Sequence, residues 1–134
     1  MKKYSGKYNK EHFYSVMGKF FAEPEYKRLM PYLSNRENDE WIIIEKEGDV
    51  VAFSSYTQTK AGTNIKSCYY QKLPDARKII KRIIKEASGQ AYTTIIMKEN
   101  QKLIQLLIKE FGFRQTKVTK NYIYLKKEEL ENDN

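Results

Sequence analysis

The chain has 134 residues, a formal net charge of +8, one cysteine and one histidine. This length fits a single domain over residues 1–134 and is too short for a second independent core. The positive charge attracts polyanions such as nucleic acids, phosphorylated cofactors and acidic proteins, but it does not specify a fold. Cys68 has no second cysteine to pair with, and one cysteine with one histidine cannot build the usual closed zinc site, so no metal and a reducing compartment are expected.

The sequence also predicts where the protein resides. No apolar run approaches the roughly 20 residues that span a bilayer, and residues 1–10 lack the apolar stretch of a signal peptide. We therefore expect a soluble cytoplasmic protein without a membrane partner. Eleven tyrosines, six phenylalanines and several Ile/Leu clusters supply the apolar surface of a packed core. Residues 1–10 are basic and polar, so we expect a flexible start, with order beginning near His12.

The first half of the chain predicts helical material followed by an antiparallel meander. The apolar spacing from Phe13 to Phe21 fits either a helix or a short strand, and Pro24 is typical of the start of a second, short helix. Three strands are then expected, because runs rich in β-branched and aromatic residues alternate with turn residues. The strands cover residues 41–44, 50–56 and 65–70, and the turns cover 47–49 and 60–64.

The second half of the chain predicts alternating helices and strands. Apolar residues at helical spacing indicate a helix that begins near Pro74 and ends near Gly89. A strand follows at 92–97, and a second amphipathic helix opens at Asn100 and is closed by Gly112. Residues 113–125 complete the order as two short strands or one bent strand. Residues 126–134 form a charged tail that we expect to be flexible.

This order of elements defines a fold class. A strand, a helix and a strand in succession imply one parallel strand pair with a right-handed crossover. The preceding meander makes the rest of the sheet antiparallel. We therefore predict a mixed α/β (α+β) domain with a mostly antiparallel central sheet and flanking helices.

The order resembles that of the GCN5-related N-acetyltransferases over residues 11–127. Residues 41–53, WIIIEKEGDVVAF, resemble the paired second and third strands of that family. Residues 100–113, which open with Asn100 and close with Gly112 and Phe113, resemble its final helix. The resemblance implies an acyl-CoA N-acyltransferase-like fold and an N-acetyltransferase that uses acetyl-CoA as its cosubstrate.

The phosphate-binding signature of that family, Q/R-x-x-G-x-G/A, has its best register at residues 71–76, QKLPDA, where Gln71 and Ala76 match. A second register aligns residues 74–77 with the P-E-x-R motif of the family. It puts Ile80 and Arg82 at positions where the family has glycines, so the first register is preferred. Backbone N–H groups at a helix N-terminus approach a pyrophosphate in such loops, and Pro74 removes one of these donors. The same residues also fit an ordinary solvated helix start.

In the preferred register, the basic residues of this segment supply positive charge that offsets the missing donor. The resemblance then implies a set of cofactor-binding residues at the end of the third predicted strand, in the loop, in the first helical turn and at the start of the last helix. These are Tyr69, Tyr70, Gln71, Lys72, Leu73, Asp75, Ala76, Arg77, Lys78 and Asn100.

The resemblance also implies direct attack of an amine on the thioester, with a tyrosine of the last helix protonating the departing thiolate. That position falls on Leu107 when counted from Asn100, or on Ile108 when counted from Gly112, and neither side chain donates a proton. The catalytic residues therefore stay unassigned. Other candidates have simpler structural interpretations, as packed strand tyrosines, a small buried thiol or solvated groups. They are Tyr69, Tyr70, Tyr122, Tyr124, Glu45, His12 and Cys68.

Two other functions stay open on the sequence alone. A catalytically idle relative that binds CoA or a protein fits the missing glycines and the missing tyrosine. A nucleic-acid-binding protein fits the basic residues, although interspersed glutamates favour a solvated basic surface. The basic residues in question are Lys2, Lys3, Lys7, Lys10, Lys78, Lys81, Arg82 and Lys85. The amine acceptor is unknown, with its pocket expected from residues 13–38, and a homodimer is compatible with the sequence.

Overall fold

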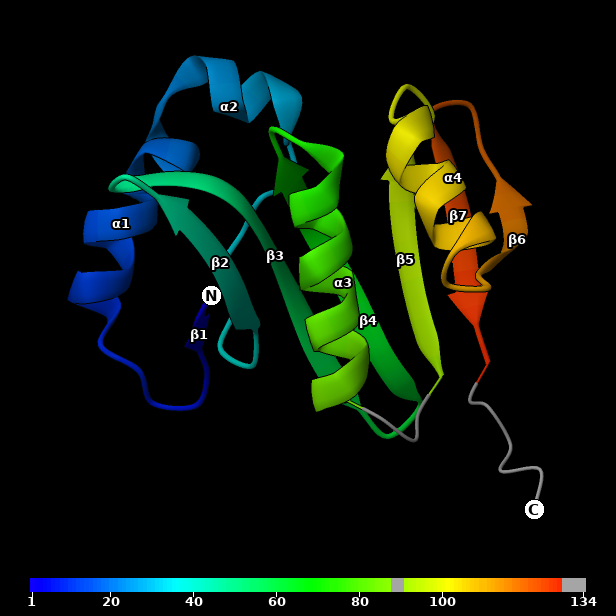
Figure 1. The fold of residues 1–134 in the computed structure, drawn as a ribbon, viewed down its shortest axis with the longest axis horizontal. Coiled ribbons are helices and arrows are strands. Elements are labelled where there is room, and N and C mark those ends of the chain that lie inside the picture. Colours follow the sequence, from blue (N-terminus) through cyan, green and yellow to red (C-terminus); the bar gives the residue numbers. More distant parts are fainter. Residues whose placement is uncertain (88–90, 129–134) are drawn as a thin grey trace.

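A seven-stranded sheet organises the protein, which is represented by a computed structural model that describes residues 1–87 and 91–128. The strand order is β1-β2-β3-β4-β5-β7-β6 (Figure 1). β4 and β5 are parallel, and the other neighbouring strands are antiparallel. The predicted mixed α/β fold class is therefore confirmed. The strands are β1 (Lys2–Tyr4), β2 (Glu40–Lys46), β3 (Asp49–Thr59), β4 (Gly62–Tyr70), β5 (Tyr92–Met97), β6 (Arg114–Val118) and β7 (Tyr122–Lys127).

Helices cover both faces of this sheet. α1 (Lys10–Ala22) and α2 (Pro24–Leu29) lie on one face, and α3 (Leu73–Glu86) and α4 (Gln101–Lys109) lie on the other (Figure 1). Phe13 and Trp41 belong to the core beneath α1, whereas Ile79 and Leu103 belong to the core beneath α3 and α4. α1, α3 and α4 are each held because they bury an apolar stripe against the sheet, whereas α2 packs through the partly buried Tyr26.

The start of the chain is ordered, in contrast to the flexible start expected for residues 1–10. β1 pairs with β2, and Tyr4 is only 7% exposed. The Tyr4 hydroxyl lies 2.9 Å from Nδ1 of His12 at the beginning of α1. Asn9 accepts a hydrogen bond from the His12 N–H and caps α1, which resolves the segment from Phe13 onward as a helix. Tyr4 and the partly buried Tyr8 thus anchor an otherwise polar segment to the core beneath α1.

Two other predicted boundaries concern the start of the charged tail and the end of the helix before Gly89. Lys126 and Lys127 lie in β7, paired with Thr93 and Tyr92, so the expected flexible tail does not begin at Lys126. Residues 129–134 of that tail lie outside the described residues, and so does the expected helix end at Gly89.

β4 and β5 pair at one end and separate at the other. Residues 63–65 of β4 pair with residues 92–94 of β5, and beyond them residues 66–70 and 95–97, which the structure describes in full, diverge (Figure 1). We call these two diverging segments the fork. At its closed end, Gly62 has a φ of 142°, and a Cβ there would lie 2.6 Å from the carbonyl oxygen of Ala91. Glycine therefore permits the close approach from which the strands diverge.

Candidate functional site

A β-bulge marks the place where β4 leaves β5. The register with β3 shifts between Phe53 and Ser55, so Ser67 and Cys68 together stand opposite Ser54. Ser67 has a φ of 52°, in the left-handed region that non-glycine residues seldom adopt. Bulges bend a strand and are common beside functional sites. This bulge lies in the first half of the β4 side of the fork.

The open end of the fork lies next to the start of α3, because only Gln71 and Lys72 separate β4 from that helix. Across the described residues, Lys72 makes no side-chain cap, and Pro74 in the first turn has no N–H. An uncapped helix start presents backbone N–H groups and the positive end of the helix dipole to an anion. Lys72 and Lys78 are exposed, and neither is ion-paired within residues 1–87 and 91–128. This end of α3 therefore suits a phosphate group.

Two of the predicted site residues turn their side chains into the protein. Asp75 is 2% exposed, and its carboxylate accepts hydrogen bonds from Nζ of Lys46 at 3.2 and 3.1 Å. Ala76 is fully buried in the core beneath α3. Asp75 thus ties the start of α3 to the end of β2, and Ala76 offers a ligand its backbone alone.

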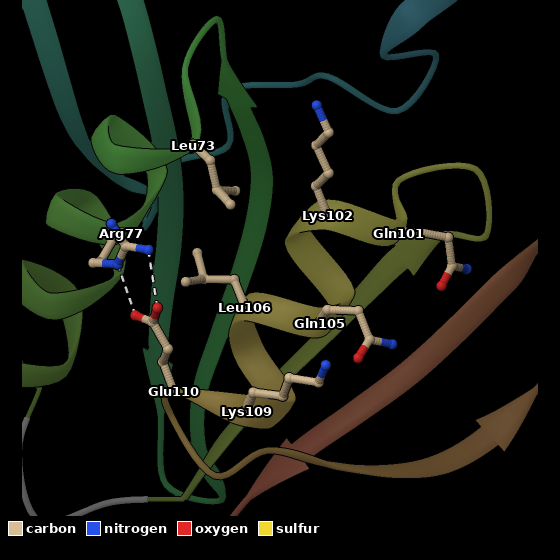
Figure 2. Close-up of a pocket in the computed structure, with 8 residues that line it drawn as sticks. All are labelled: Leu73, Arg77, Gln101, Lys102, Gln105, Leu106, Lys109 and Glu110. Atoms are coloured by element: carbon tan, nitrogen blue, oxygen red, sulfur yellow. Dashed lines mark hydrogen bonds and ion pairs between the residues drawn. The ribbon is translucent and has the colours of Figure 1, made fainter.

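A groove of about 410 Å³ runs between α3 and α4. Leu73 and Leu106 face each other across it, and Arg77 and Glu110 connect the two helices at one end (Figure 2). Arg77 donates from Nε at 2.7 Å and from a terminal nitrogen at 2.9 Å to the Glu110 carboxylate. These hydrogen bonds raise the pKa of Arg77 and lower the pKa of Glu110. Arg77 is therefore held by Glu110 instead of being free for a phosphate.

Sequence analysis missed the α4 side of this groove. Lys102, Leu106 and Lys109 recur at helical spacing, which places them on one face of α4. That pattern marks a shared face, but only the packing of α4 beside α3 shows that the face lines a groove. The complete lining is Leu73, Arg77, Gln101, Lys102, Gln105, Leu106, Lys109 and Glu110.

The remaining predicted residues meet in pairs at the open end of the fork. The Tyr70 hydroxyl donates to Oδ1 of Asn100 at 2.5 Å. Gln71 donates from Nε2 to the Tyr69 hydroxyl at 3.3 Å, and the Tyr69 ring stacks on Phe53 on the α1 face of the sheet. The structure thus brings Tyr70 and Asn100 together and directs Tyr69 to the opposite face.

On that opposite face, the segment that follows α2 reaches across the tips of the fork. Tyr26 of α2 contacts Tyr69 near the tip of β4, with ring centroids 6.0 Å apart. Six residues later, Tyr32 contacts Tyr122 of β7, the strand beside β5, with centroids 5.5 Å apart. A hydrogen bond with Tyr32 raises the pKa of Tyr122 to about 12. The Tyr122 phenol is therefore protonated at neutral pH.

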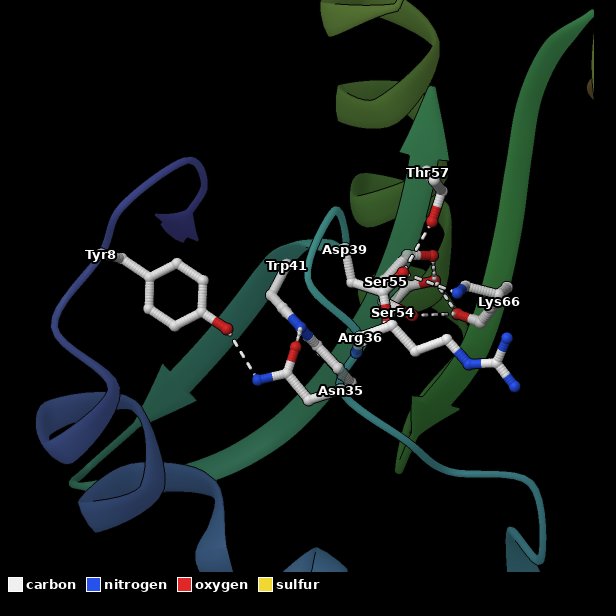
Figure 3. Close-up of polar contacts among 9 residues, drawn as sticks. All are labelled: Tyr8, Asn35, Arg36, Asp39, Trp41, Ser54, Ser55, Thr57 and Lys66. Atoms are coloured by element: carbon white, nitrogen blue, oxygen red, sulfur yellow. Dashed lines mark hydrogen bonds and ion pairs between the residues drawn. The ribbon is translucent and has the colours of Figure 1, made fainter. Parts of the chain in front are cut away.

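A buried carboxylate fixes the loop that precedes β2 (Figure 3). Oδ1 of Asp39 accepts hydrogen bonds from Nζ of Lys66 and Oγ1 of Thr57, both at 2.6 Å, and Oδ2 accepts from the Arg36 N–H at 2.8 Å. Burial alone would raise the pKa of Asp39, but the hydrogen bonds from Lys66, Thr57 and Arg36 outweigh it and lower the pKa. Asp39 is therefore a carboxylate that joins this loop to β3 and β4.

Asn35, one residue before Arg36, provides a second attachment of the same loop. Its Oδ1 accepts from Nε1 of Trp41 at 2.9 Å, and its Nδ2 donates to the Tyr8 hydroxyl at 2.7 Å (Figure 3). Trp41 is fully buried beneath α1. The second half of this loop, residues 35–39, is thus held by buried or half-buried polar contacts.

The other sequence candidates for catalysis lie away from the fork or are chemically inert. His12 contacts Tyr4 of β1, and Glu45 pairs with Lys2 of β1 at 3.3 Å. β1 is the edge strand, three places from β4 in the sheet. Burial raises the pKa of the Cys68 thiol to about 12, so it is not a nucleophilic thiolate at neutral pH.

The described residues contain neither a membrane-spanning helix nor a metal-binding group. Over residues 1–87 and 91–128, no helix has the length and hydrophobicity needed to cross a bilayer. The same residues hold no group of three or more His, Cys, Asp or Glu side chains placed to bind a metal ion.

Comparison of the fold with solved structures identifies its class. No protein-family model and no curated protein sequence matches the chain. Escherichia coli ElaA has a similar structure, with a TM-score of 0.68 and 11% identity over 95% of this chain and 97% of that one. An acyl-CoA N-acyltransferase from Pseudomonas aeruginosa also scores 0.68, with 9% identity over 95% and 99% of the two chains. The chain therefore has the acyl-CoA N-acyltransferase fold.

A third similar structure contains a ligand. Campylobacter jejuni N-acetyltransferase PseH, solved in complex with acetyl coenzyme A, has a TM-score of 0.56 and 11% identity over 95% of this chain and 99% of that one. Other structures of similar fold are acetyltransferases too, and one is described as of the GNAT family. The predicted resemblance to the GCN5-related N-acetyltransferases is thus confirmed for the fold.

Proposed function

We propose that this protein is a cytoplasmic N-acetyltransferase that moves the acetyl group of acetyl-CoA to an amine. The observation that carries the proposal is the fork between parallel strands β4 and β5, which opens beside the uncapped start of α3. The similar fold of N-acetyltransferases, one with acetyl coenzyme A bound, supports it.

The donor's diphosphate would lie at the start of α3. The backbone of the first turn and the ammonium groups of Lys72 and Lys78 supply the positive environment. Pro74 removes one backbone donor, and losing one charge-assisted hydrogen bond costs about 1.5–3 kcal/mol, or roughly ten- to hundredfold in affinity. The two lysines offset part of this loss.

Transfer would occur directly between the two substrates. The amine nitrogen attacks the thioester carbonyl carbon, the C–S bond breaks, the amine loses a proton and the departing thiolate gains one. The Cys68 thiol is protonated at neutral pH, because burial raises its pKa to about 12, and this disfavours an acetyl-cysteine intermediate. The amine would approach from the α2 side, because α3 and α4 cover the other face of the sheet.

A catalytically idle acyl-CoA-binding protein is the second candidate. The observation that favours it is that both positions where the resemblance calls for a tyrosine acid, Leu107 and Ile108, carry aliphatic side chains, and Leu107 is only 1% exposed. A positioned acid typically contributes about 10²–10⁴ in rate. The proposed enzyme, which lacks this acid, should therefore turn over slowly, with water protonating the departing thiolate.

An acetyl-transfer assay tests the proposal. Acetyl-CoA is supplied with a panel of amines, including diamines, aminosugars and peptide N-termini, and release of the free CoA thiol is followed. Thiol release that requires one class of amine is the expected result. If acetyl-CoA binds saturably but no amine in the panel increases thiol release, the idle candidate is established.

Charge reversal at the two ends of α3 provides a matched pair of variants. Lys72→Glu should raise the KM for acetyl-CoA by about tenfold or more, because it removes a cation and adds an anion beside the diphosphate. Lys85→Glu makes the same charge change in the last turn of α3 and should leave KM nearly unchanged. Equal effects of the two variants would indicate a general charge effect and contradict the phosphate site.

A further inference from the structure

A side-chain hydrogen bond connects the two sides of the fork. Tyr70 is the last residue of β4, and Asn100 directly precedes α4, which follows β5. The Tyr70 hydroxyl donates to Oδ1 of Asn100 at 2.5 Å. Backbone pairing of β4 with β5, within the described residues, ends at Ile65 and Thr94, so this contact links segments that no ladder joins.

The same hydroxyl also serves the start of α4. Asn100 occupies the N-cap position, but its side chain makes no cap hydrogen bond within the described part of the chain. The backbone N–H of Leu103, in the first turn of α4, lies near enough to the Tyr70 hydroxyl to favour its ionised form. Burial nevertheless raises the pKa of Tyr70, so the phenol is protonated and donates to Asn100 at neutral pH. Tyr70 thus contacts the N-cap residue of a helix that belongs to the other side of the fork.

This bond lies between the two places that the donor must occupy. Tyr70 is separated from the first residue of α3 by Gln71 and Lys72, so it lies at the open end of the fork beside the phosphate site. A donor whose diphosphate rests on α3 and whose thioester lies deeper in the fork has to pass this point. We propose that the Tyr70–Asn100 hydrogen bond is a latch that acetyl-CoA displaces as it enters the fork; the proposal rests on the proposed function.

The consequence is that Tyr70 lowers the affinity for the donor. The donor binds only when the Tyr70–Asn100 hydrogen bond is broken, and the free energy of breaking this bond weakens binding. Affinity falls for the same reason whenever only a small fraction of a protein is in its binding-competent state. Tyr70→Phe keeps the ring in its packing position and removes the hydroxyl. We expect its Kd and KM for acetyl-CoA to fall by about two- to tenfold, the range of one neutral hydrogen bond.

Tyr4→Phe is the matched control. It also removes a hydrogen-bonded phenol hydroxyl, the one that contacts His12, but on the edge strand β1. Its affinity for acetyl-CoA should equal that of the wild type, while both variants lose a comparable amount of thermal stability. A change of affinity in Tyr70→Phe alone would therefore arise from the fork and not from the general loss of a hydrogen-bonded hydroxyl.

Calorimetric titration of the wild type and the two variants with acetyl-CoA distinguishes the outcomes. Tighter binding by Tyr70→Phe alone supports the latch. Unchanged binding overturns the latch, because the hydrogen bond then lies outside the donor's path, and weaker binding overturns it because the hydroxyl then contacts the donor. Absence of binding by the wild type itself overturns the proposed function and the latch with it.

Discussion

Asp39 and Lys66 are 27 residues apart in the chain, and Oδ1 of one lies 2.6 Å from Nζ of the other. Asp39 is 2% exposed, and Lys66 is the first residue of β4 beyond its pairing with β5. The ion pair therefore joins the loop before β2 to the base of the fork. It holds this loop in place against β4 on the α1 side of the candidate site.

Removing the charge of Asp39 tests this connection. Asp39→Asn should lower the free energy of unfolding by about 1.5–3 kcal/mol, because it weakens hydrogen bonds to a buried carboxylate and leaves Lys66 without its partner. Urea denaturation measures the change. Glu128→Gln breaks the exposed pair with Arg114 and should leave the free energy of unfolding nearly unchanged, because exposed ion pairs contribute little. Equal losses in the two variants would show that Asp39 does not organise the loop.

The same carboxylate makes stability depend on acidic pH. Burial opposes ionisation of Asp39, but hydrogen bonds from Lys66, Thr57 and Arg36 outweigh it and lower the pKa in the folded protein. A lowered folded pKa stabilises the protein above the ordinary aspartate value, near 3.9, and that stabilisation disappears as the pH falls through the folded value. The stability difference between wild type and Asp39→Asn should therefore be constant near neutrality and shrink below about pH 4. A difference that grows on acidification would contradict the assigned direction.

Gly62 allows a prediction about the closed end of the fork. Gly62→Ala should destabilise the protein by about 1–3 kcal/mol, because its φ is 142° and the new Cβ would meet the Ala91 carbonyl oxygen at 2.6 Å. Gly18→Ala is the control, since Gly18 lies within α1 with open space around the new Cβ. That change should stabilise by about 0.5–1 kcal/mol. Thermal unfolding of both variants measures the effects, and a neutral Gly62→Ala would mean that the strands can separate there without cost.

The structure assigns different sides of α4 to the two positions that sequence analysis left open for a tyrosine acid. Leu106 faces α3 across the groove, and Ile108 lies about 200° further around the helix, on the side turned away from α3. Leu107 lies between them and is buried in the core beneath α4. The position counted from Asn100 is therefore the more deeply buried of the two, although Ile108 also packs, partly exposed, against the same core.

Installing a phenol at each position tests this assignment. Leu107→Tyr should raise kcat for acetyl transfer by up to about 10²-fold, while overpacking lowers stability by about 1–3 kcal/mol. Ile108→Tyr should leave kcat unchanged. Single-turnover acetyl transfer measures both, and a faster Ile108→Tyr variant would reverse the assignment.

Much of the fold follows from local sequence. The strand predicted at residues 92–97 has the same bounds as β5, and α3 begins one residue before the predicted Pro74. These segments have strong periodicity and clear turn residues. β1 was missed because a three-residue strand carries little periodicity, and its position depends on Tyr4 docking against α1 and β2.

The candidate site was less accessible to sequence analysis. The helix start within the segment from Gln71 to Lys78 was predicted because it is a local feature, whereas the binding of a phosphate there stays a prediction. Tyr70 and Asn100 were each named, but no local pattern indicates that residues 30 positions apart share a hydrogen bond. The Arg77–Glu110 pair across the groove depends in the same way on how α4 packs beside α3.

Equilibrium titration with acetyl-CoA tests the central claim most directly. The proposal predicts one saturable site per chain, with affinity weakened by Lys72→Glu and unaffected by Lys85→Glu, and with little competition from duplex DNA at physiological salt. The contradicting result is no binding of acetyl-CoA together with DNA binding that falls steeply as salt rises, since that is the behaviour of a basic nucleic-acid-binding surface.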